Sequence, residues 1–185
     1  MVIVKRRDDS SHWAVWHKYL ADGTKWLALN LGNAEDTEST LWNSTVPTSS
    51  VISIGTNTTV NADTGTYVGY LFSSVKGFSK VGRYFGNGLA DGAFIHTGFK
   101  PAFILCKKTS ASDNWEVHDS KRGTYNPVSK SLTPNSNATE ASSRDIDFLS
   151  NGFKQRNTNG NTNQSGATYV YIAFAESPFK YTNAE

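Results

Sequence analysis

The chain contains an internal duplication. Residues 65–75 read GTYVGYLFSSV, and residues 166–176 read GATYVYIAFAE. Tyr67 recurs as Tyr169, 102 positions later, and the same shift carries Trp13 onto Trp115. Solenoid repeats have periods of about 20 to 50 residues, so a shift this long predicts a duplicated half-domain or domain.

The duplication predicts three parts. A first β repeat covers residues 1–85, a Gly-rich bridge with a connecting strand covers 86–102, and a second β repeat covers 103–185. The sequence leaves open whether the repeats form two sandwiches or pool their strands in one joint domain. A counterpart of residues 93–101 before the first copy would lie upstream of Met1, so we expect the chain to be the C-terminal portion of a longer protein or to have been trimmed to start in its first strand.

Composition and alternation predict an all-β fold. The chain is rich in Ser, Thr, Asn and Gly, and 12% of its residues are aromatic. These residues favour strands and turns over helices. We therefore expect an antiparallel β-sandwich of lectin or jelly-roll type, built from the duplicated unit. Residues 67–72 and 169–174 are apolar on both faces, which predicts two central strands. Residues 51–54 and 152–156 are expected to form matching short strands.

Charge and apolar runs exclude several classes of protein. The net charge of +2 predicts no broad field for nucleic acid. Two basic clusters, at residues 5–7 and 107–108, are interpreted as solvated strand ends. Apolar runs stop at about ten residues, so we expect no signal peptide, no membrane insertion and a soluble chain made in the cytoplasm. Cys106 lies in an apolar run and is expected to be a buried thiol.

The search for catalytic chemistry returns one weak candidate. Asp145 and Asp147 share one face of a predicted strand, as paired acids do in sandwich glycosidases. The sites of those enzymes have a Glu-x-Asp-x-x-Glu pattern. In this chain Ser150, three residues after Asp147, occupies the place of the third carboxylate. The sequence therefore favours solvated acids over a glycan hydrolase. The histidines show no metal-ligand spacing, and we expect no enzyme activity, metal or cofactor.

Three tryptophans are the candidate ligand-binding residues. Trp13 and Val15 stay apolar in the second copy, whereas Trp16 becomes His118, which predicts that Trp16 points away from the core. Trp26 also alternates outward. If these residues and Trp42 are exposed, they could stack on sugar rings. The alternative is that a neighbouring subunit covers them.

A resemblance extends over most of the chain. It is carried by VIVKRR (2–7), WAVWH (13–17), WNSTVPTSSV (42–51), GTYV (65–68), GFSK (77–80), GNG (86–88), DIDFLSNGFK (145–154) and AESPFKYTNA (175–184). These segments resemble domains of bacteriophage tail-fibre and other virion proteins, notably of phages with marine and cyanobacterial hosts.

The resemblance implies a concanavalin-like sandwich that serves as a non-enzymatic structural module of the virion. It implies a homotrimer that contacts other virion proteins, with host-surface glycan as a further expected partner, and it carries over no catalytic residues. A carbohydrate-binding module is the alternative function.

Overall fold

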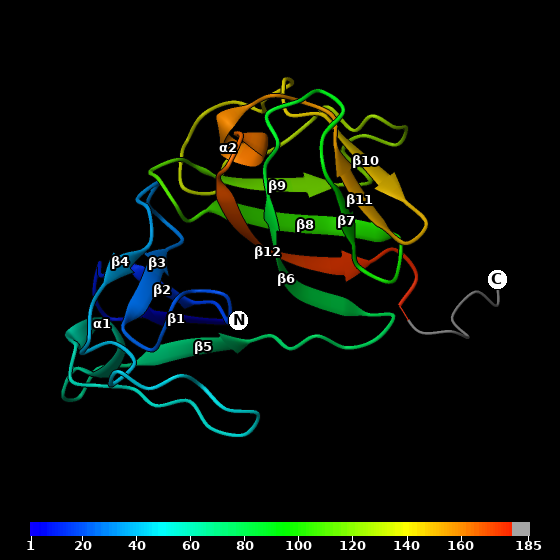
Figure 1. Cartoon of the computed structure of the whole chain (residues 1–185). Coiled ribbons are helices and arrows are strands. Elements are labelled where there is room, and N and C mark those ends of the chain that lie inside the picture. The colour runs from blue at the N-terminus through cyan, green and yellow to red at the C-terminus, as the bar shows by residue number, and fades with distance from the viewer. Residues whose placement is uncertain (179–185) are drawn as a thin grey trace.

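The computed structural model describes residues 1–178, and these are nearly all β (Figure 1). The final part of the predicted second repeat, residues 179–185, lies outside the described residues. The strands are β1 (Val2–Arg6), β2 (Trp13–Trp16), β3 (Lys25–Ala28), β4 (Asp36–Thr37), β5 (Tyr67–Leu71), β6 (Ser79–Phe85), β7 (Phe94–His96), β8 (Pro101–Lys108), β9 (Trp115–Asp119), β10 (Ile146–Leu149), β11 (Gly152–Gln155) and β12 (Thr168–Ala175).

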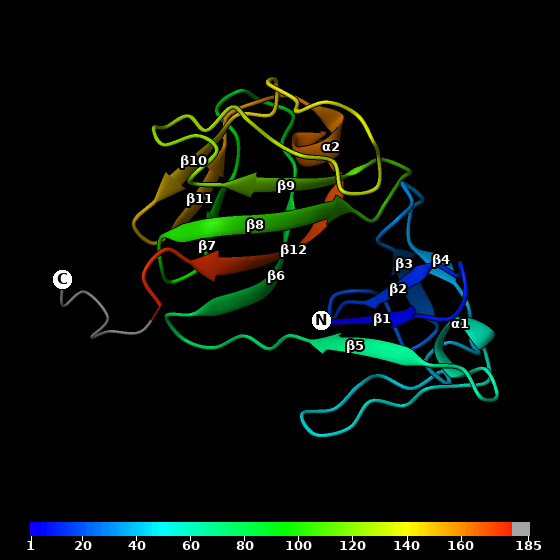
Figure 2. The same ribbon diagram turned by 180° about the vertical axis from the view of Figure 1, so that it is seen from behind.

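Three antiparallel sheets pack together, as Figures 1 and 2 show from opposite sides. The first sheet has the order β4-β3-β2-β1-β5, the second β6-β12-β8-β9 and the third β10-β11-β7. The expected all-β sandwich is confirmed. Two short helices, α1 (Thr58–Asn61) and α2 (Gly160–Asn163), complete the fold. Within residues 1–178, no helix is long and apolar enough to cross a membrane.

The two halves share one strand register. In the first half, Val4 of β1 pairs with Ala14 of β2 on one side and with Gly69 of β5 on the other. In the second half, Cys106 of β8 pairs with Glu116 of β9 and with Tyr171 of β12. These two partners lie 102 positions after Ala14 and Gly69. Each residue type differs between the copies, yet the pairing is the same, so the duplication predicted from sequence corresponds to a repeated set of strands.

The helices repeat as well. Asn57 caps α1 by accepting the amide of Thr59, and Asn159 caps α2 in the same way. The hydroxyl of Tyr67 accepts the amide of Ala62 at 2.6 Å, and it donates to the carbonyl that begins α1 at 2.7 Å. The hydroxyl of Tyr169 makes the corresponding two bonds 102 positions later, at 2.8 and 2.6 Å.

Equivalent faces of the two halves form the central core. Ile3 and its counterpart Leu105 belong to one apolar cluster between the first two sheets, together with Val15 and Trp115. The orientation of Trp13 and Val15 toward the core is as expected. A second cluster lies between the second and third sheets, and a third lies between the first sheet and the segment 41–60. The halves therefore pack into one layered body.

Two strand expectations are wrong. β12 is central, but its counterpart β5 is an edge strand, where Tyr70 and Leu71 are 44% and 65% exposed. The reason is that β6, which follows β5 in the chain, crosses over to pair with β12. Residues 51–54, expected to form a strand like 152–156, have no strand structure and lie in the segment beneath the first sheet. Residues 152–155 do form β11.

Candidate functional site

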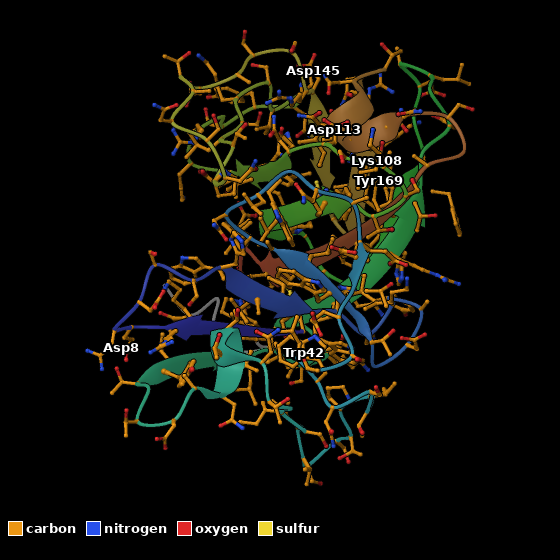
Figure 3. The ribbon with its side chains drawn as sticks, turned by 90° about the vertical axis from the view of Figure 1, so that its left-hand side faces the viewer. Asp8, Trp42, Lys108, Asp113, Asp145 and Tyr169 are labelled. Carbon is orange, nitrogen blue, oxygen red and sulfur yellow. The ribbon has the colours of Figure 1, made fainter. Side chains whose placement is uncertain are left out.

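Two of the three candidate tryptophans are buried. Trp16 is 6% exposed and Trp42 is 0% exposed, so the expectation that they form a sugar-stacking surface is wrong. Trp16 does point to the face opposite Trp13, as predicted. However, the segment 41–60 covers that face, and Leu41, Trp42 and Val60 pack against Trp16 in the third cluster (Figure 3 labels Trp42).

Trp26 is half-buried and lines a pocket of about 190 Å³ at the outer edge of the first sheet. β3 and β4 position it, because Trp26 pairs with Asp36 across the two strands. The ring of His12 lies over the same pocket, with its centroid 6.3 Å from that of Trp26. Leu27 and Leu31 contribute to the apolar wall, and the pocket is therefore a small aromatic hollow open to solvent.

Polar groups converge on this pocket. Asp36 is exposed, and one of its carboxylate oxygens accepts the amide of Thr37 at 2.7 Å. Asn33 is exposed, and its side-chain amide has no hydrogen-bond partner within residues 1–178. Asn30 contacts His12 Nδ1 at 3.1 Å and so orients the imidazole. An aromatic ring flanked by carboxylate, amide and imidazole groups suits a ligand with an apolar face and hydroxyl groups.

The sequence identified Trp26 in this pocket but missed its polar partners. His12 and Asn33 lie in irregular segments, and Asp36 begins the short strand β4. No periodicity in the sequence reveals that these residues approach β3. The one local sequence signal for Asn33 and Asp36 is that they lie in a polar segment, residues 32–40, directly after a strand of alternating pattern.

Asp147 of the predicted acid pair has a side-chain partner, whereas Asp145 is held through its backbone carbonyl. Asp147 Oδ2 lies 3.4 Å from Arg156 Nε, and the Asp147 side chain is 19% exposed. Asp145, labelled in Figure 3, is half-buried and directly precedes β10. The carbonyl of Asp145 accepts the amide of Arg156 at 2.8 Å and the side chain of Asn157. This setting is that of structural acids at a strand end.

A buried polar cluster occupies the second half. Glu116 is fully buried, and its carboxylate accepts bonds from Asn161 at 2.6 Å and from Arg144 at 3.0 Å. Burial raises the pKa of Glu116 from its ordinary value. The corresponding positions of the first half, 102 residues earlier, hold Ala14 and Trp42, which are both in the third apolar cluster. The first half thus fills this region with the indole of Trp42, and the second half fills it with the ion pair of Glu116 and Arg144.

The remaining ionisable candidates are buried and held neutral. Desolvation raises the pKa of Cys106 to about 12 and lowers the pKa of His17 to about 3 and that of His118 to about 4. Cys106 is the buried thiol that the sequence predicts. Within residues 1–178, no group of three or more His, Cys, Asp and Glu side chains could hold a metal ion.

The interpretation of the second basic cluster as a solvated strand end is wrong. Lys107 and Lys108 are 0% and 3% exposed. The Nζ of Lys108 contacts Asp113 at 2.5 Å and Gln164 at 2.9 Å, whereas Lys107 Nζ donates to backbone carbonyls (Figure 3 labels Lys108 and Asp113). Burial lowers the pKa of Lys107 to about 8. Turns from both halves, which contain Gly32 and Asp113, meet at these side chains.

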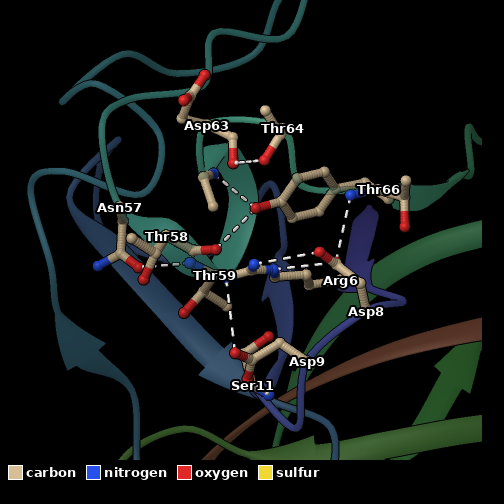
Figure 4. A network of polar contacts seen from close by, with 12 residues as sticks. Arg6, Asp8, Asp9, Ser11, Asn57, Thr58, Thr59, Asp63, Thr64 and Thr66 are labelled. Atoms are coloured by element: carbon tan, nitrogen blue, oxygen red, sulfur yellow. Dashed lines mark hydrogen bonds and ion pairs between the residues drawn. The ribbon is translucent and has the colours of Figure 1, made fainter.

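The first basic cluster is tied down by a neighbouring turn. Arg6 contacts Asp8 at 3.0 Å, and Asp8 also accepts the amide of Thr66 at 3.2 Å (Figure 4). The hydrogen bond from Arg6 lowers the pKa of Asp8 to about 2. Arg6 and Lys108 occupy equivalent strand ends and both bind an aspartate, so these clusters fasten the turns of the two halves.

Comparison with known proteins places this architecture in a family. The pattern of a family described as "Domain of unknown function (DUF7483)" matches residues 1–178. The chain belongs to this family. The match spans both halves, so the DUF7483 pattern covers the duplicated pair as one unit. No curated protein matches the chain, and no solved structure matches it.

Proposed function

We propose that this DUF7483 domain is a non-enzymatic structural module of a bacteriophage virion, in a tail fibre or a similar appendage, which assembles with further copies of itself. The observation that supports assembly is the free edge of β5. Its counterpart β12 is flanked by β6 and β8, whereas β5 pairs with β1 alone among the described strands. An apolar edge strand offers unpaired backbone groups to another chain.

The surface beside this edge is apolar. Leu71 and Phe72 line a hollow of about 250 Å³ with Pro47 and Ile52. Leu71 is 65% exposed, and no Asp, Glu, Lys or Arg side chain of the part of the chain that the structure describes lines this hollow. Subunit interfaces are depleted in charge at their centres, so this surface fits a contact between copies. The resemblance adds the expectation of a trimer, of contacts to other virion proteins and of a place in the virion after synthesis in the host cytoplasm.

The solution mass of the protein tests assembly. We expect a trimer by light scattering after gel filtration, and Leu71→Lys is expected to give a monomer because it places a charge in the interface. Leu89→Lys is the matched control, because Leu89 is 60% exposed but lies in the bridge between β6 and β7. A monomeric parent protein, or an unchanged mass for Leu71→Lys, would refute assembly through this edge.

The Trp26 pocket favours a second candidate function, carbohydrate binding. Trp26 supplies a stacking surface, and Asn33 and Asp36 supply groups that can bind hydroxyls. We expect selective binding on a glycan array, lost in Trp26→Ala and retained in Tyr125→Ala. Tyr125 is the control because it is 86% exposed and lies outside this pocket. Equal loss in both variants, or no binding of any glycan, would exclude this function.

A glycan hydrolase is the third candidate and has the least support, since Arg156 engages Asp147. Release of reducing sugar from host polysaccharide, abolished by Asp147→Asn, would overturn the non-enzymatic assignment. We expect no release by the parent protein.

A further inference from the structure

A groove runs between β6 and β7, which are edge strands of the second and third sheets. Its volume is about 430 Å³, and Gly82, Tyr84 and Tyr171 form its floor. Three of its aromatic side chains are exposed, with Tyr19 at 37%, Phe85 at 57% and Phe94 at 46%. A second hollow of about 340 Å³ lies alongside and shares Lys80 and His96 with the groove. Together they form an elongated surface.

Two aromatic rings position the guanidinium group of Arg83 on this surface. Its guanidinium carbon lies 5.2 Å from the ring centroid of Tyr19 and 5.6 Å from that of Phe85. Lys18 Nζ lies 4.9 Å from the same tyrosine ring. Contacts of this kind with ring faces fix the plane of a guanidinium while its N–H groups stay free. The rings therefore order Arg83 before any ligand arrives.

The cations of the groove have no carboxylate partner. Arg6, Arg122, Arg144 and Arg156 each form an ion pair. Arg83, like the exposed Arg7, has neither an ion pair nor a hydrogen bond from its side chain within residues 1–178. Lys18, Lys76 and Lys80 also lack an ion pair in the described chain. Among residues 1–178, no Asp or Glu lines either hollow. Cations left unpaired in one place, on a chain of net charge +2, favour an anionic ligand.

The arrangement of rings and cations indicates the class of this ligand. Flat bases stack on free aromatic faces, but Arg83 already lies over faces of Tyr19 and Phe85. A guanidinium fork binds carboxylate or sulfate with two parallel hydrogen bonds. The exposed ring of Phe94 offers an apolar face for the C–H groups of a sugar. We propose that this groove binds an anionic polysaccharide, with Arg83 as the contact for its carboxylate or sulfate groups. The groove is separate from both the Trp26 pocket and the β5 edge.

Binding of the full chain to four immobilised polymers tests the proposal. The polymers are polygalacturonate, dextran sulfate, neutral dextran and single-stranded oligothymidylate. We expect binding to one or both anionic polysaccharides, weakened by salt, and no binding to neutral dextran. The first two polymers distinguish a carboxylate from a sulfate as the recognised group. Preference for oligothymidylate, binding to neutral dextran or binding to none of the four would overturn the proposal.

Substitutions locate the site. Arg83→Gln is expected to weaken binding about tenfold or more, because the fork is lost. Arg83→Lys keeps the charge but lacks the fork, so it should restore only part of the binding. The control is Arg7→Gln, since Arg7 is exposed and has no ion pair in the described chain. Lys80→Glu provides an independent test at the junction of the two hollows and should also abolish binding. If Arg83→Gln and Lys80→Glu both fold and bind as well as Arg7→Gln does, the assignment of binding to this groove is wrong.

Discussion

Phe72 and Phe174 contact each other edge to face, with ring centroids 5.9 Å apart and an interplanar angle of 67°. The two residues occupy equivalent positions of the two halves, 102 residues apart. Both side chains pack against the apolar cluster between the first two sheets. The duplicated unit has therefore formed its core by packing one copy of a sheet face against the other.

The first prediction concerns this contact. Replacing Phe72 and Phe174 singly and together by Ala should reveal a coupling energy of about 1 kcal/mol, as aromatic pairs show in double-mutant cycles. Urea unfolding of the four proteins measures it. The pair Phe72 and Phe94 should be additive, because Phe94 lies on the β6–β7 groove. A coupling of zero between Phe72 and Phe174 would mean that the symmetric contact adds nothing beyond burial.

The second prediction compares the twin tyrosines. Tyr169→Phe removes two hydrogen bonds from a fully buried residue and should lower the free energy of unfolding by about 1–3 kcal/mol. Tyr67→Phe removes the same two bonds at a half-buried position, where water can replace them, so we expect a smaller loss of about 1 kcal/mol. Chemical denaturation of both variants provides the measurement. A larger loss for Tyr67→Phe would contradict this explanation.

The third prediction uses the difference between the halves at Glu116 and Arg144. Arg144→Ala leaves the buried carboxylate without its charged partner and should cost roughly 3–5 kcal/mol of stability. The double variant Glu116→Ala with Arg144→Trp installs the residues of the first half, Ala14 and Trp42. It should be more stable than Arg144→Ala, because no buried charge remains unpaired. Chemical denaturation compares the free energies of unfolding of the two variants. A double variant less stable than Arg144→Ala would show that the halves differ in shape at these positions.

The fourth prediction concerns pH. Burial lowers the pKa of His17 to about 3 and of His118 to about 4, whereas an unfolded histidine titrates near 6.5. Between these values the unfolded chain binds more protons than the folded chain. The stability present above pH 6.5 is therefore lost as the pH falls toward 4. Glu116 acts in the opposite sense, because its raised pKa favours proton binding by the folded state.

Thermal unfolding at pH 7.5, 5.5 and 4.5 tests this prediction. The midpoint should fall with pH in the parent protein, and the fall should be smaller when His17 and His118 are replaced by Gln. His96→Gln is the control, since His96 is exposed. An unchanged pH profile in the double variant would assign acid lability to other groups.

Local pattern and the internal repeat determined much of this fold. The constant shift between the copies predicted that residues 2–6 and 104–108 occupy equivalent strands, and their partners agree residue by residue. The alternation of Trp13 and Trp16 correctly assigned each side chain to its face of the sheet. Such patterns work because a strand has a period of two, so sequence spacing alone decides which residues share a face.

Tertiary packing decided which faces meet water. Trp16 points away from the central core and is still buried, because residues distant in sequence, such as Trp42 and Val60, pack over it. β5 and β12 have nearly the same pattern, yet one is an edge and the other is central, because β6 pairs with β12. The sequence by itself determined the strands and their orientation. Exposure depends on contacts between distant segments, and so the tertiary structure alone decided the location of the free edge, the Trp26 pocket and the cationic groove.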